Sequence, residues 1–161
     1  MTAYVFDALD RTISMTEAVG TSVERTSSWA YDAVSNLTSA TDALGRVTVY
    51  AFDALNRTTA LTEAVGTAVE RTTTWGYDAV SNLTSTTDAL GRSTQYVYDA
   101  LDRVTALTEA VGTAVERTTQ YAYDAVDNYV STTDALGRVT AFVYDALNRT
   151  VSMTEAVGTT V

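Results

Sequence analysis

The chain has 161 residues, a formal net charge of −10 and 46% hydrophobic residues. Its excess of acidic side chains argues against binding to nucleic acid or to an anionic membrane surface, because both are negatively charged. The sequence contains no cysteine and no histidine, which excludes disulfides, thiolate nucleophiles, zinc–thiolate sites and imidazole bases.

The first predicted element is a strand over residues 1–6 that carries Tyr4 and Phe6. Two aromatic residues two positions apart point to the same face of a strand, whereas apolar residues at helical spacing are missing here. The strand has no basic segment before it, so we expect no cleavable leader and interpret the chain as a piece of a longer protein. No apolar run approaches the eighteen or so residues that cross a bilayer, so membrane insertion is not expected.

A turn follows at Asp7, whose side-chain oxygen can accept a hydrogen bond from the backbone two residues on. The second strand carries Ile13 and Met15 at its apolar positions. It ends in a loop with Gly20, where a positive φ can reverse the chain. The next half-unit repeats this order, starting from the aromatic pair Trp29 and Tyr31.

The half-units recur along the whole chain. The turn aspartate returns every 46 residues, and each period divides into parts of 25 and 21 residues, as from Asp7 to Asp32 to Asp53. The difference is a four-residue insertion, present between Gly66 and Arg71 but missing after Gly91. Residues 1–161 are therefore predicted to form a single array of seven half-units. The fold class is all-β, a repetitive antiparallel β-hairpin meander of about fourteen short strands.

The aromatic, aspartate and glycine positions of the half-units are interpreted as structural, and no catalytic, cofactor-binding or metal-binding residue is predicted. These structural repeat positions are Phe6, Asp7, Gly20, Tyr31, Asp32, Gly45, Phe52, Asp53, Gly66, Tyr77, Asp78, Gly91, Tyr98, Asp99, Gly112, Tyr123, Asp124, Gly137, Tyr144, Asp145 and Gly158.

The repeated aspartates have two alternative interpretations, as an acid–base set or as a ladder of calcium sites. Paired carboxylates catalyse glycoside cleavage when their environments push their pKa values apart, but these aspartates are uniform in all copies. A calcium loop needs several oxygens around a sharp glycine bend, whereas residues 78–82 supply one carboxylate, one amide and no glycine. Capping of the turns is the favoured interpretation.

The aromatic stripe could be a platform for stacking sugars, but the favoured prediction is that it forms the buried face of the sheet. An aromatic side chain that becomes buried removes about 150–250 Å² of surface from contact with water. Glu-Arg pairs such as Glu70 and Arg71 recur once per period. They could pair across neighbouring repeats, but the favoured role is to keep strand edges from sticking together.

These motifs resemble the YD-repeat, or Rhs, family. Residues 77–84 read Tyr-Asp-Ala-Val-Ser-Asn-Leu-Thr, and residues 87–92 read Thr-Asp-Ala-Leu-Gly-Arg before the next aromatic pair. The likeness extends over essentially the whole chain. It departs from the family pattern where Asn56, Asp102 or Ser81 replaces the glycine of the first turn. Asn and Asp tolerate the left-handed conformation, and Ser81 is the less comfortable case.

The resemblance implies a curved or spiral strip that, in bacterial Rhs toxins and toxin-complex C components, winds into a hollow shell around a C-terminal toxic domain. Wall-associated proteins and teneurins belong to the same family. The expected function is thus a non-catalytic structural segment of such a shell or scaffold, extracellular or at the cell surface, without cofactors. Its expected partners are further YD repeats of the same or an identical chain, and a glycan or an encapsulated toxin domain in the parent protein.

Two alternatives to the structural role stay open at this point. Identical units could assemble head to tail into a filament or oligomer, since repeat arrays join through complementary ends. The sheet could also be a carbohydrate- or protein-binding module at a cell surface. An enzyme is the least favoured function.

Overall fold

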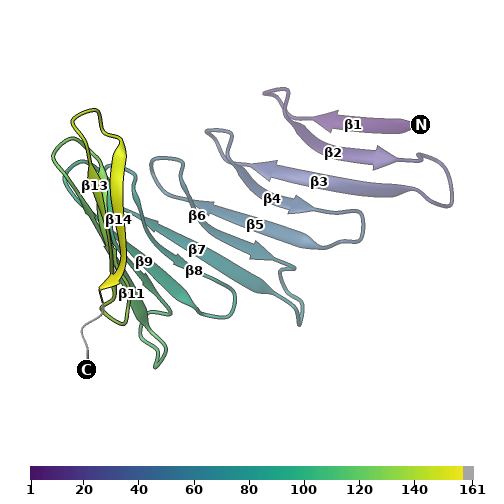
Figure 1. Cartoon of the computed structure of the whole chain (residues 1–161). Helices are drawn as coiled ribbons and strands as arrows, with labels where there is room; N and C mark the ends of the chain where they lie inside the picture. The colour runs from purple at the N-terminus through teal and green to yellow at the C-terminus, as the bar shows by residue number, and fades with distance from the viewer. Residues whose placement is uncertain (158–161) are drawn as a thin grey trace. The chain divides into compact units, whose positions relative to one another are not determined.

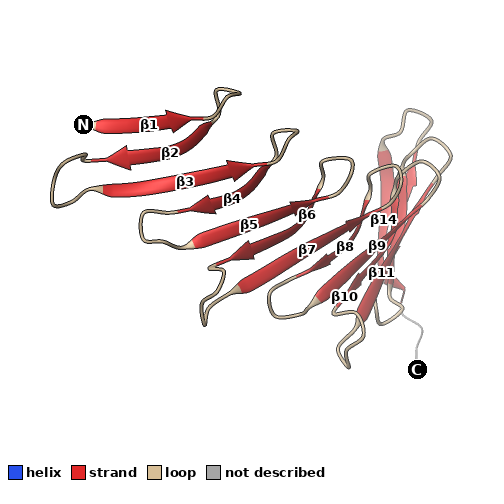
Figure 2. Ribbon diagram, turned by 180° about the vertical axis from the view of Figure 1, so that it is seen from behind, coloured by secondary structure: helices blue, strands red, loops and turns tan. Residues whose placement is uncertain are grey.

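The computed structural model describes residues 1–157, and over that range it contains fourteen β-strands and no helix (Figures 1 and 2). Each strand pairs antiparallel with its sequence neighbours, in the sheet order β1 to β14. The predicted all-β meander of about fourteen strands is confirmed. The strands are β1 Thr2–Phe6, β2 Thr12–Glu17, β3 Arg25–Tyr31, β4 Leu37–Thr41, β5 Val47–Phe52, β6 Thr58–Glu63, β7 Arg71–Tyr77, β8 Leu83–Thr87, β9 Ser93–Tyr98, β10 Val104–Glu109, β11 Arg117–Tyr123, β12 Tyr129–Thr133, β13 Val139–Tyr144 and β14 Thr150–Val157.

Contacts between Cα atoms divide the chain into two compact units. The first comprises Met1–Trp75 and Asp88–Leu90, and the second comprises Gly76–Thr87 and the chain from Gly91 onward. Each unit repeats the same hairpins, so the description below holds for each unit by itself. The array over residues 1–161 as a single domain stays a prediction. No helix that could span a membrane is found among the described residues.

The strand register places the aromatic pairs on one face, called here the aromatic face. Tyr4 lies opposite Met15, which lies opposite Ser27 in the next strand. Directly opposed residues share a face, so Tyr4 and Phe6 lie on the same side as Met15. The other face carries small and β-branched residues such as Thr16 and Thr26, whose Oγ1 atoms are 2.9 Å apart.

Two rims of loops border the strands. The uniform rim joins each odd-numbered strand to the next even-numbered one through turns of equal length, at residues 7–11, 32–36, 53–57, 78–82, 99–103, 124–128 and 145–149. The alternating rim joins even-numbered to odd-numbered strands through long loops at residues 18–24, 64–70 and 110–116 and short turns at residues 42–46, 88–92 and 134–138. Two of the four inserted residues thus lengthen every second loop of one rim, where the insertion was expected, and the other two extend the flanking strands.

The predicted buried aromatic core is wrong. No side chain among the described residues is fully buried, because the chain forms a single layer with no second layer packed on it. The aromatic residues are half-buried by their neighbours on the same face, except Tyr4 and Phe6 in β1, which are 54% exposed. In a one-layer sheet an aromatic ring is covered only by its neighbours on the same face, so it remains half-buried.

Gly76 in β7 breaks the pattern of the small-residue face. The equivalent position in β3 is Ala30, opposite Ser39, and in β11 it is Ala122, opposite Ser131. A Cβ added at Gly76 would lie 2.5 Å from the Oγ of Ser85, the free end of a side chain that can rotate away.

We therefore expect Gly76→Ala to raise the free energy of unfolding by about 0.5–1 kcal/mol, because glycine weakens a strand interior and the Ala–Ser pair fits elsewhere. Urea unfolding of the two proteins measures the difference. A lower midpoint for Gly76→Ala would show that Ser85 has no room to turn.

Candidate functional site: the aspartate turns and the aromatic face

Each turn of the uniform rim is built around an aspartate carboxylate. Asp7 Oδ1 accepts hydrogen bonds from the backbone N–H of Leu9 at 2.9 Å and of Arg11 at 3.0 Å. Its Oδ2 accepts one from Arg11 Nε at 2.7 Å. Where the fourth residue is asparagine, its amide replaces the guanidinium, as in the 2.8 Å bond from Asn36 Nδ2 to Asp32 Oδ2. The carboxylate therefore holds the whole turn, and the predicted capping role fits these contacts.

The backbone of each turn is closed by two further hydrogen bonds. Asp7 N donates to Arg11 O at 3.0 Å, and Asp10 N donates to Asp7 O at 3.1 Å. The third residue after the aspartate has a positive φ in these turns, including 60° at Asn56, 60° at Asp102 and 78° at Ser81. The left-handed conformation expected at these three positions is confirmed.

Replacing the serines at this left-handed position is expected to stabilise the turns. Ser35 has a φ of 72°, and its Oγ accepts a hydrogen bond from Arg11 Nη1 at 3.0 Å. Asparagine tolerates positive φ better than serine and also offers an oxygen acceptor. Ser35→Asn is expected to stabilise the chain by about 0.5–1 kcal/mol, about half of the usual left-handed penalty. Thermal unfolding checks this, with Asn56→Ser as the reciprocal variant, which should lose a similar amount.

The fourth turn residue also reaches the next turn of the uniform rim. Arg11 Nη1 donates to Asp32 O at 2.8 Å, and Asn36 Nδ2 donates to Asn56 Oδ1 at 2.9 Å. In the second unit the same bonds run from Asn82 to Asp102, from Arg103 to Asp124 and Asp127, and from Asn128 to Asn148. This relay links successive hairpins within each unit by side chains, in addition to the strand pairing.

The second aromatic of a pair is fixed by the same neighbours. The Arg11 guanidinium lies over the Tyr31 ring, 4.8 Å from its centroid, and the Tyr31 hydroxyl donates to Thr12 O at 3.1 Å. Arg103 and Tyr123 repeat both contacts in the second unit, at 4.6 Å and 3.1 Å. Such cation–π stacking holds the arginine between its aspartate and a ring.

Tyr129 stands where β4 and β8 have leucine, Leu37 and Leu83. Its ring centroid lies 6.1 Å from that of Tyr121, 5.8 Å from that of Tyr123 and 5.5 Å from that of Phe142. It therefore joins the aromatic face, with three other rings close to it.

Of the two roles considered for the Glu-Arg dipeptides, pairing with the same dipeptide of another repeat is not what Arg71 does, and keeping strand edges apart stays a prediction. Arg71 instead binds Glu63, which lies opposite it in the adjacent strand, at 2.8 Å and 3.0 Å. Glu70 points into its own loop, where its Oε2 accepts a hydrogen bond from Gly66 N at 2.6 Å. The loop also needs a left-handed residue two positions before its glycine, Ala64 with a φ of 53°, which no sequence pattern had signalled.

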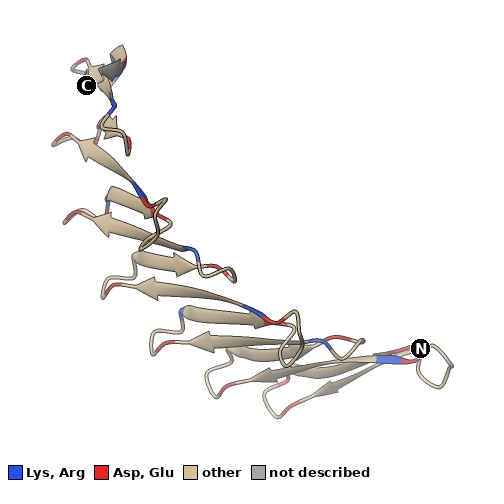
Figure 3. Cartoon of the chain, turned by 90° about the horizontal axis from the view of Figure 1, so that it is seen from below, with Lys and Arg blue, Asp and Glu red and all other residues tan. Residues whose placement is uncertain are grey.

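Charge is confined to the two rims and the strand ends, as Figure 3 shows. The hydrogen bond from Arg25 is the main cause that lowers the pKa of Glu17. The hydrogen bond from Arg103 likewise lowers the pKa of Asp99, and that from Asn128 lowers the pKa of Asp124. Around Asp7 partial burial raises the pKa, but hydrogen bonds from the backbone and side chain of Arg11 outweigh it. These aspartates are held as carboxylates, which suits capping and opposes proton transfer near neutral pH.

Residues 1–157 contain no group of three or more acidic side chains placed to hold a metal ion. An apolar hollow of about 230 Å³ lies on the aromatic face between β9 and β11, lined by Tyr96, Val104, Leu107, Tyr121 and Tyr123. The structural repeat positions named from the sequence thus fall in turns, loops and the aromatic face, while Gly158 lies outside the described residues.

The sequence profile of the RHS Repeat family matches residues 31–68, 77–114 and 123–160, which together make up more than half of the chain. The chain belongs to the RHS repeat family. Each matched RHS repeat begins at the second aromatic of a pair, immediately before the turn aspartate, and the first two matches end in long loops of the alternating rim.

Solved structures share the fold of these RHS repeats. The crystal structure of TcdB2-TccC3 matches 96% of this chain with a TM-score of 0.69 and 17% sequence identity. TcdB2-TccC3 without its hypervariable C-terminal region matches 96% with a TM-score of 0.69 and 18% identity. In both cases the RHS repeats span 9% of the length of the solved chain. No curated protein matches the chain significantly.

Proposed function

We propose that this chain is a non-catalytic structural segment of an Rhs-type protein, and that it forms part of a β-sheet shell or scaffold outside the cell. The observation that carries the proposal is the turn relay, which couples each hairpin to the next through Arg or Asn side chains. Such nearest-neighbour coupling suits a strip that is extended by adding units. The turn carboxylates are alike in all copies and already accept several hydrogen bonds, which supports a capping role rather than catalysis.

The proposed partners are further RHS repeats, which continue the sheet, and by family resemblance a toxin domain enclosed by the shell. The match to TcdB2-TccC3 covers 9% of that chain, which leaves room for further repeats in a protein of that length. The open, half-buried aromatic face is compatible with a wall one layer thick.

A segment replacement tests this function. The stretch of TcdB2-TccC3 that matches residues 1–157 would be exchanged for this chain, and the product compared with one that carries a Gly/Ser-rich insert of equal length. We expect the RHS exchange to give particles of the parental size and protease resistance, and the Gly/Ser insert to give open, protease-sensitive ones. Equal protease sensitivity of the two products, with the isolated chain folded by circular dichroism, would count against a wall segment.

A binding module at the cell surface is the second candidate, favoured by the hollow between Tyr96 and Tyr121. Tyrosines around an apolar hollow can stack on the faces of sugar rings. A glycan array distinguishes the two functions, because the structural function predicts no bound glycan. A specific hit that Tyr121→Ala abolishes would favour the binding module.

A further inference from the structure

The sheet has two edge strands, β1 and β14, and each pairs with a single strand among the described residues. The outward side of an edge strand offers backbone N–H and C=O groups that can bind a further strand. All of β1 and residues 150–155 of β14 are exposed, whereas the residues equivalent to 150–155 in β2, β6 and β10 are half-buried. Both edges therefore lack the neighbour that covers each inner strand.

Arg149, in the last turn of the uniform rim, has the donor half of a relay contact. It binds the aspartate of its own turn, with Nη2 2.7 Å from Asp145 Oδ2, as the other turn arginines do. Arg11 and Arg103, which also reach the next turn, have side chains 21% and 19% exposed. The side chain of Arg149 is 72% exposed, and within residues 1–157 it has no contact with a second turn. Its Nη1 group is therefore available to a turn of another chain.

Asp10, in the first turn of the uniform rim, has the acceptor half of the same contact. It is exposed and occupies the left-handed position, with a φ of 57°. The residue at this position accepts a hydrogen bond from the preceding turn at Ser35, Asn56, Asp102, Asp127 and Asn148. In the described part of the chain no donor reaches the carboxylate of Asp10. An aspartate suits an arginine donor here, since Arg103 Nη1 lies 3.0 Å from Asp127 Oδ1.

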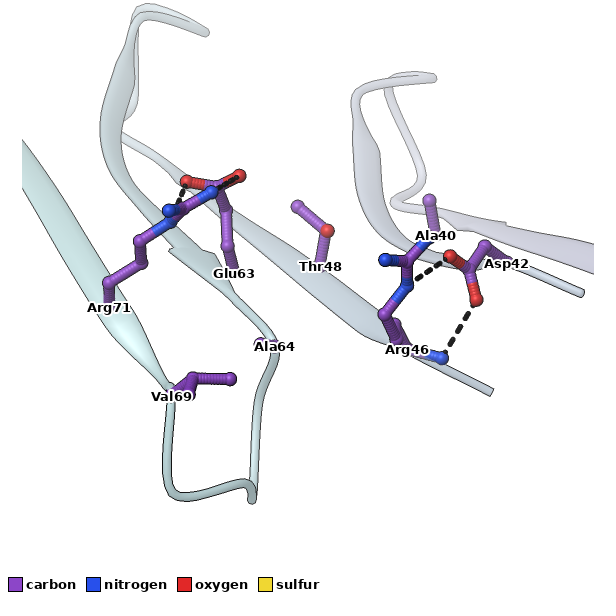
Figure 4. Close-up of a pocket in the computed structure, with 8 residues that line it drawn as sticks. All are labelled: Ala40, Asp42, Arg46, Thr48, Glu63, Ala64, Val69 and Arg71. Carbon is purple, nitrogen blue, oxygen red and sulfur yellow. Dashed lines mark hydrogen bonds and ion pairs between the residues drawn. The ribbon is translucent and has the colours of Figure 1, made fainter. Parts of the chain in front are cut away.

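Even-numbered strands meet the next odd-numbered strand at two kinds of junction, and Figure 4 shows one of each in the first unit. A long loop joins β6 to β7, and Arg71 pairs with Glu63 across these two strands. A short turn joins β4 to β5, and Arg46 pairs with Asp42 inside that turn. The two junctions thus differ in the length of the loop and in their ion pairs.

Both kinds of junction nevertheless have the same strand register. The seventh residue after one turn aspartate lies opposite the fourth residue before the next, as in Ser14–Ser28, Ser39–Val49 and Ala60–Thr74. Because the register is the same with either loop and either ion pair, it follows from the strands themselves. Two strands that no loop connects can therefore adopt it. Counted in this way from Asp145 and Asp7, Ser152 of β14 is placed opposite Ala3 of β1.

We propose that β14 of one copy of this chain pairs antiparallel with β1 of a second copy, so that one sheet continues from copy to copy. Arg149 of the first copy then donates to Asp7 O and Asp10 Oδ1 of the second. Arg103 uses the same two acceptor positions within the chain. Phe6, which is 54% exposed, offers its ring to the same guanidinium. The contact deepens the proposed structural function, on which it rests for the continued sheet, and adds a second copy as the partner.

The two halves of the contact favour this head-to-tail pairing over a symmetric one. Pairing of β1 with β1, or of β14 with β14, would bring like charges together and would leave Arg149 without Asp10. The contact is therefore heterologous, and it joins copies in series as an open chain or a ring.

The absence of cysteine from the sequence permits a direct test of the register with introduced thiols. The register places Met153 opposite Thr2, so full-length Met153→Cys and Thr2→Cys would be given different tags and mixed under mild oxidation. We expect the disulfide-linked heterodimer to exceed either linked homodimer at least about tenfold, because opposed Cα atoms about 4.5–5.5 Å apart lie within disulfide reach. Ala3→Cys in place of Thr2→Cys is the matched control, which should not link to Met153→Cys, because neighbours along a strand point to opposite faces.

Sedimentation velocity of the full chain supplies a second readout that requires no cross-link. The unaltered chain should form dimers and larger oligomers as its concentration rises. Arg149→Glu should weaken this association at least about tenfold, because a hydrogen-bonded charge pair is replaced by two acidic groups. Arg138→Glu is the matched control, since Arg138 binds Asp134 of its own turn in the same way, at 2.6 Å, but lies outside both edge strands. It should associate like the unaltered chain, with the fold of each variant checked by circular dichroism.

A double variant, Arg149→Asn with Asp10→Asn, tests the chemistry of the contact. It copies the relay bond from Asn36 Nδ2 to Asn56 Oδ1, so association should return and should no longer weaken with added salt. Association as weak as that of Arg149→Glu would overturn the assigned contact.

Three further results would overturn the proposal: a folded chain that stays monomeric, equal cross-linking of Ala3→Cys and Thr2→Cys, or equal weakening by Arg149→Glu and Arg138→Glu. A folded monomer would leave the proposed structural function standing, because the segment replacement tests that function separately.

Discussion

Tyr129→Ala is expected to lower the free energy of unfolding by about 2–3 kcal/mol, whereas Tyr129→Leu is expected to change it by less than about 1 kcal/mol. A fully buried aromatic residue loses about 3–5 kcal/mol on truncation to alanine, and Tyr129 is half-buried with three ring neighbours. Leucine restores the residue that stands at the equivalent position in β4 and β8, Leu37 and Leu83.

Urea unfolding followed by tyrosine fluorescence or circular dichroism measures both changes at Tyr129. The comparison separates the loss of the aromatic ring from the loss of packed volume, because both variants remove the ring but only alanine leaves the space empty. A loss for leucine as large as that for alanine would mean that stacking between rings, rather than contact area, stabilises the aromatic face.

Acid is expected to unfold the chain cooperatively, with stability constant above about pH 5 and falling steeply below it. Twelve carboxyl groups have a pKa below the ordinary 3.8 of Asp or 4.5 of Glu. They are Asp7, Glu17, Asp32, Asp42, Asp53, Glu63, Asp78, Asp99, Glu109, Asp124, Asp134 and Asp145.

The direction follows from proton linkage. A carboxyl group with a lowered pKa in the folded chain stabilises the fold above its unfolded pKa, and this contribution is lost as the pH falls through its folded pKa. Unfolding below about pH 4.5 should therefore take up several protons, with twelve as the upper bound from these groups. Relief of repulsion within a chain of net charge −10 acts in the opposite direction, but it is screened by salt, whereas the turn hydrogen bonds are local.

Urea midpoints between pH 2 and pH 7 measure the proton uptake, and Asp53→Asn provides the matched variant. The asparagine side chain still accepts a hydrogen bond from Leu55 N, but it carries no negative charge at any pH. The variant should therefore be less stable than the unaltered chain at pH 7, and its stability should approach that of the unaltered chain at low pH. Stability that rises on acidification would show that overall charge repulsion outweighs the turn contacts.

The sequence was informative wherever a local rule acts on neighbouring residues. Spacing by two placed Tyr4 and Phe6 on one face, because side chains in a strand alternate, and Asp7 capped its turn because its oxygen reaches the backbone N–H of Leu9. The left-handed position in the turns was likewise found, since glycine, asparagine and aspartate recur there. These features depend on a few residues in a row and needed no tertiary information.

Contacts between half-units could not be derived in the same way. The bond from Arg11 to Asp7 within the turn was not predicted, and the reach of Arg11 to Asp32 O depends on how the hairpins lie side by side. The pairing of Arg71 with Glu63 was not predicted, because the strand register was unknown. Burial was overestimated because the sequence does not state whether a second layer covers the aromatic face.

Stability as a function of array length tests most directly the claim that this chain is a strip held together by coupling between neighbouring hairpins. Whole 46-residue periods would be added to the full chain and each product unfolded in urea. The relay and the shared aromatic face predict midpoints that rise with every added period toward a plateau, described by one intrinsic and one interfacial free energy. Midpoints that do not change with length would contradict this account, because hairpins would then fold independently of their neighbours.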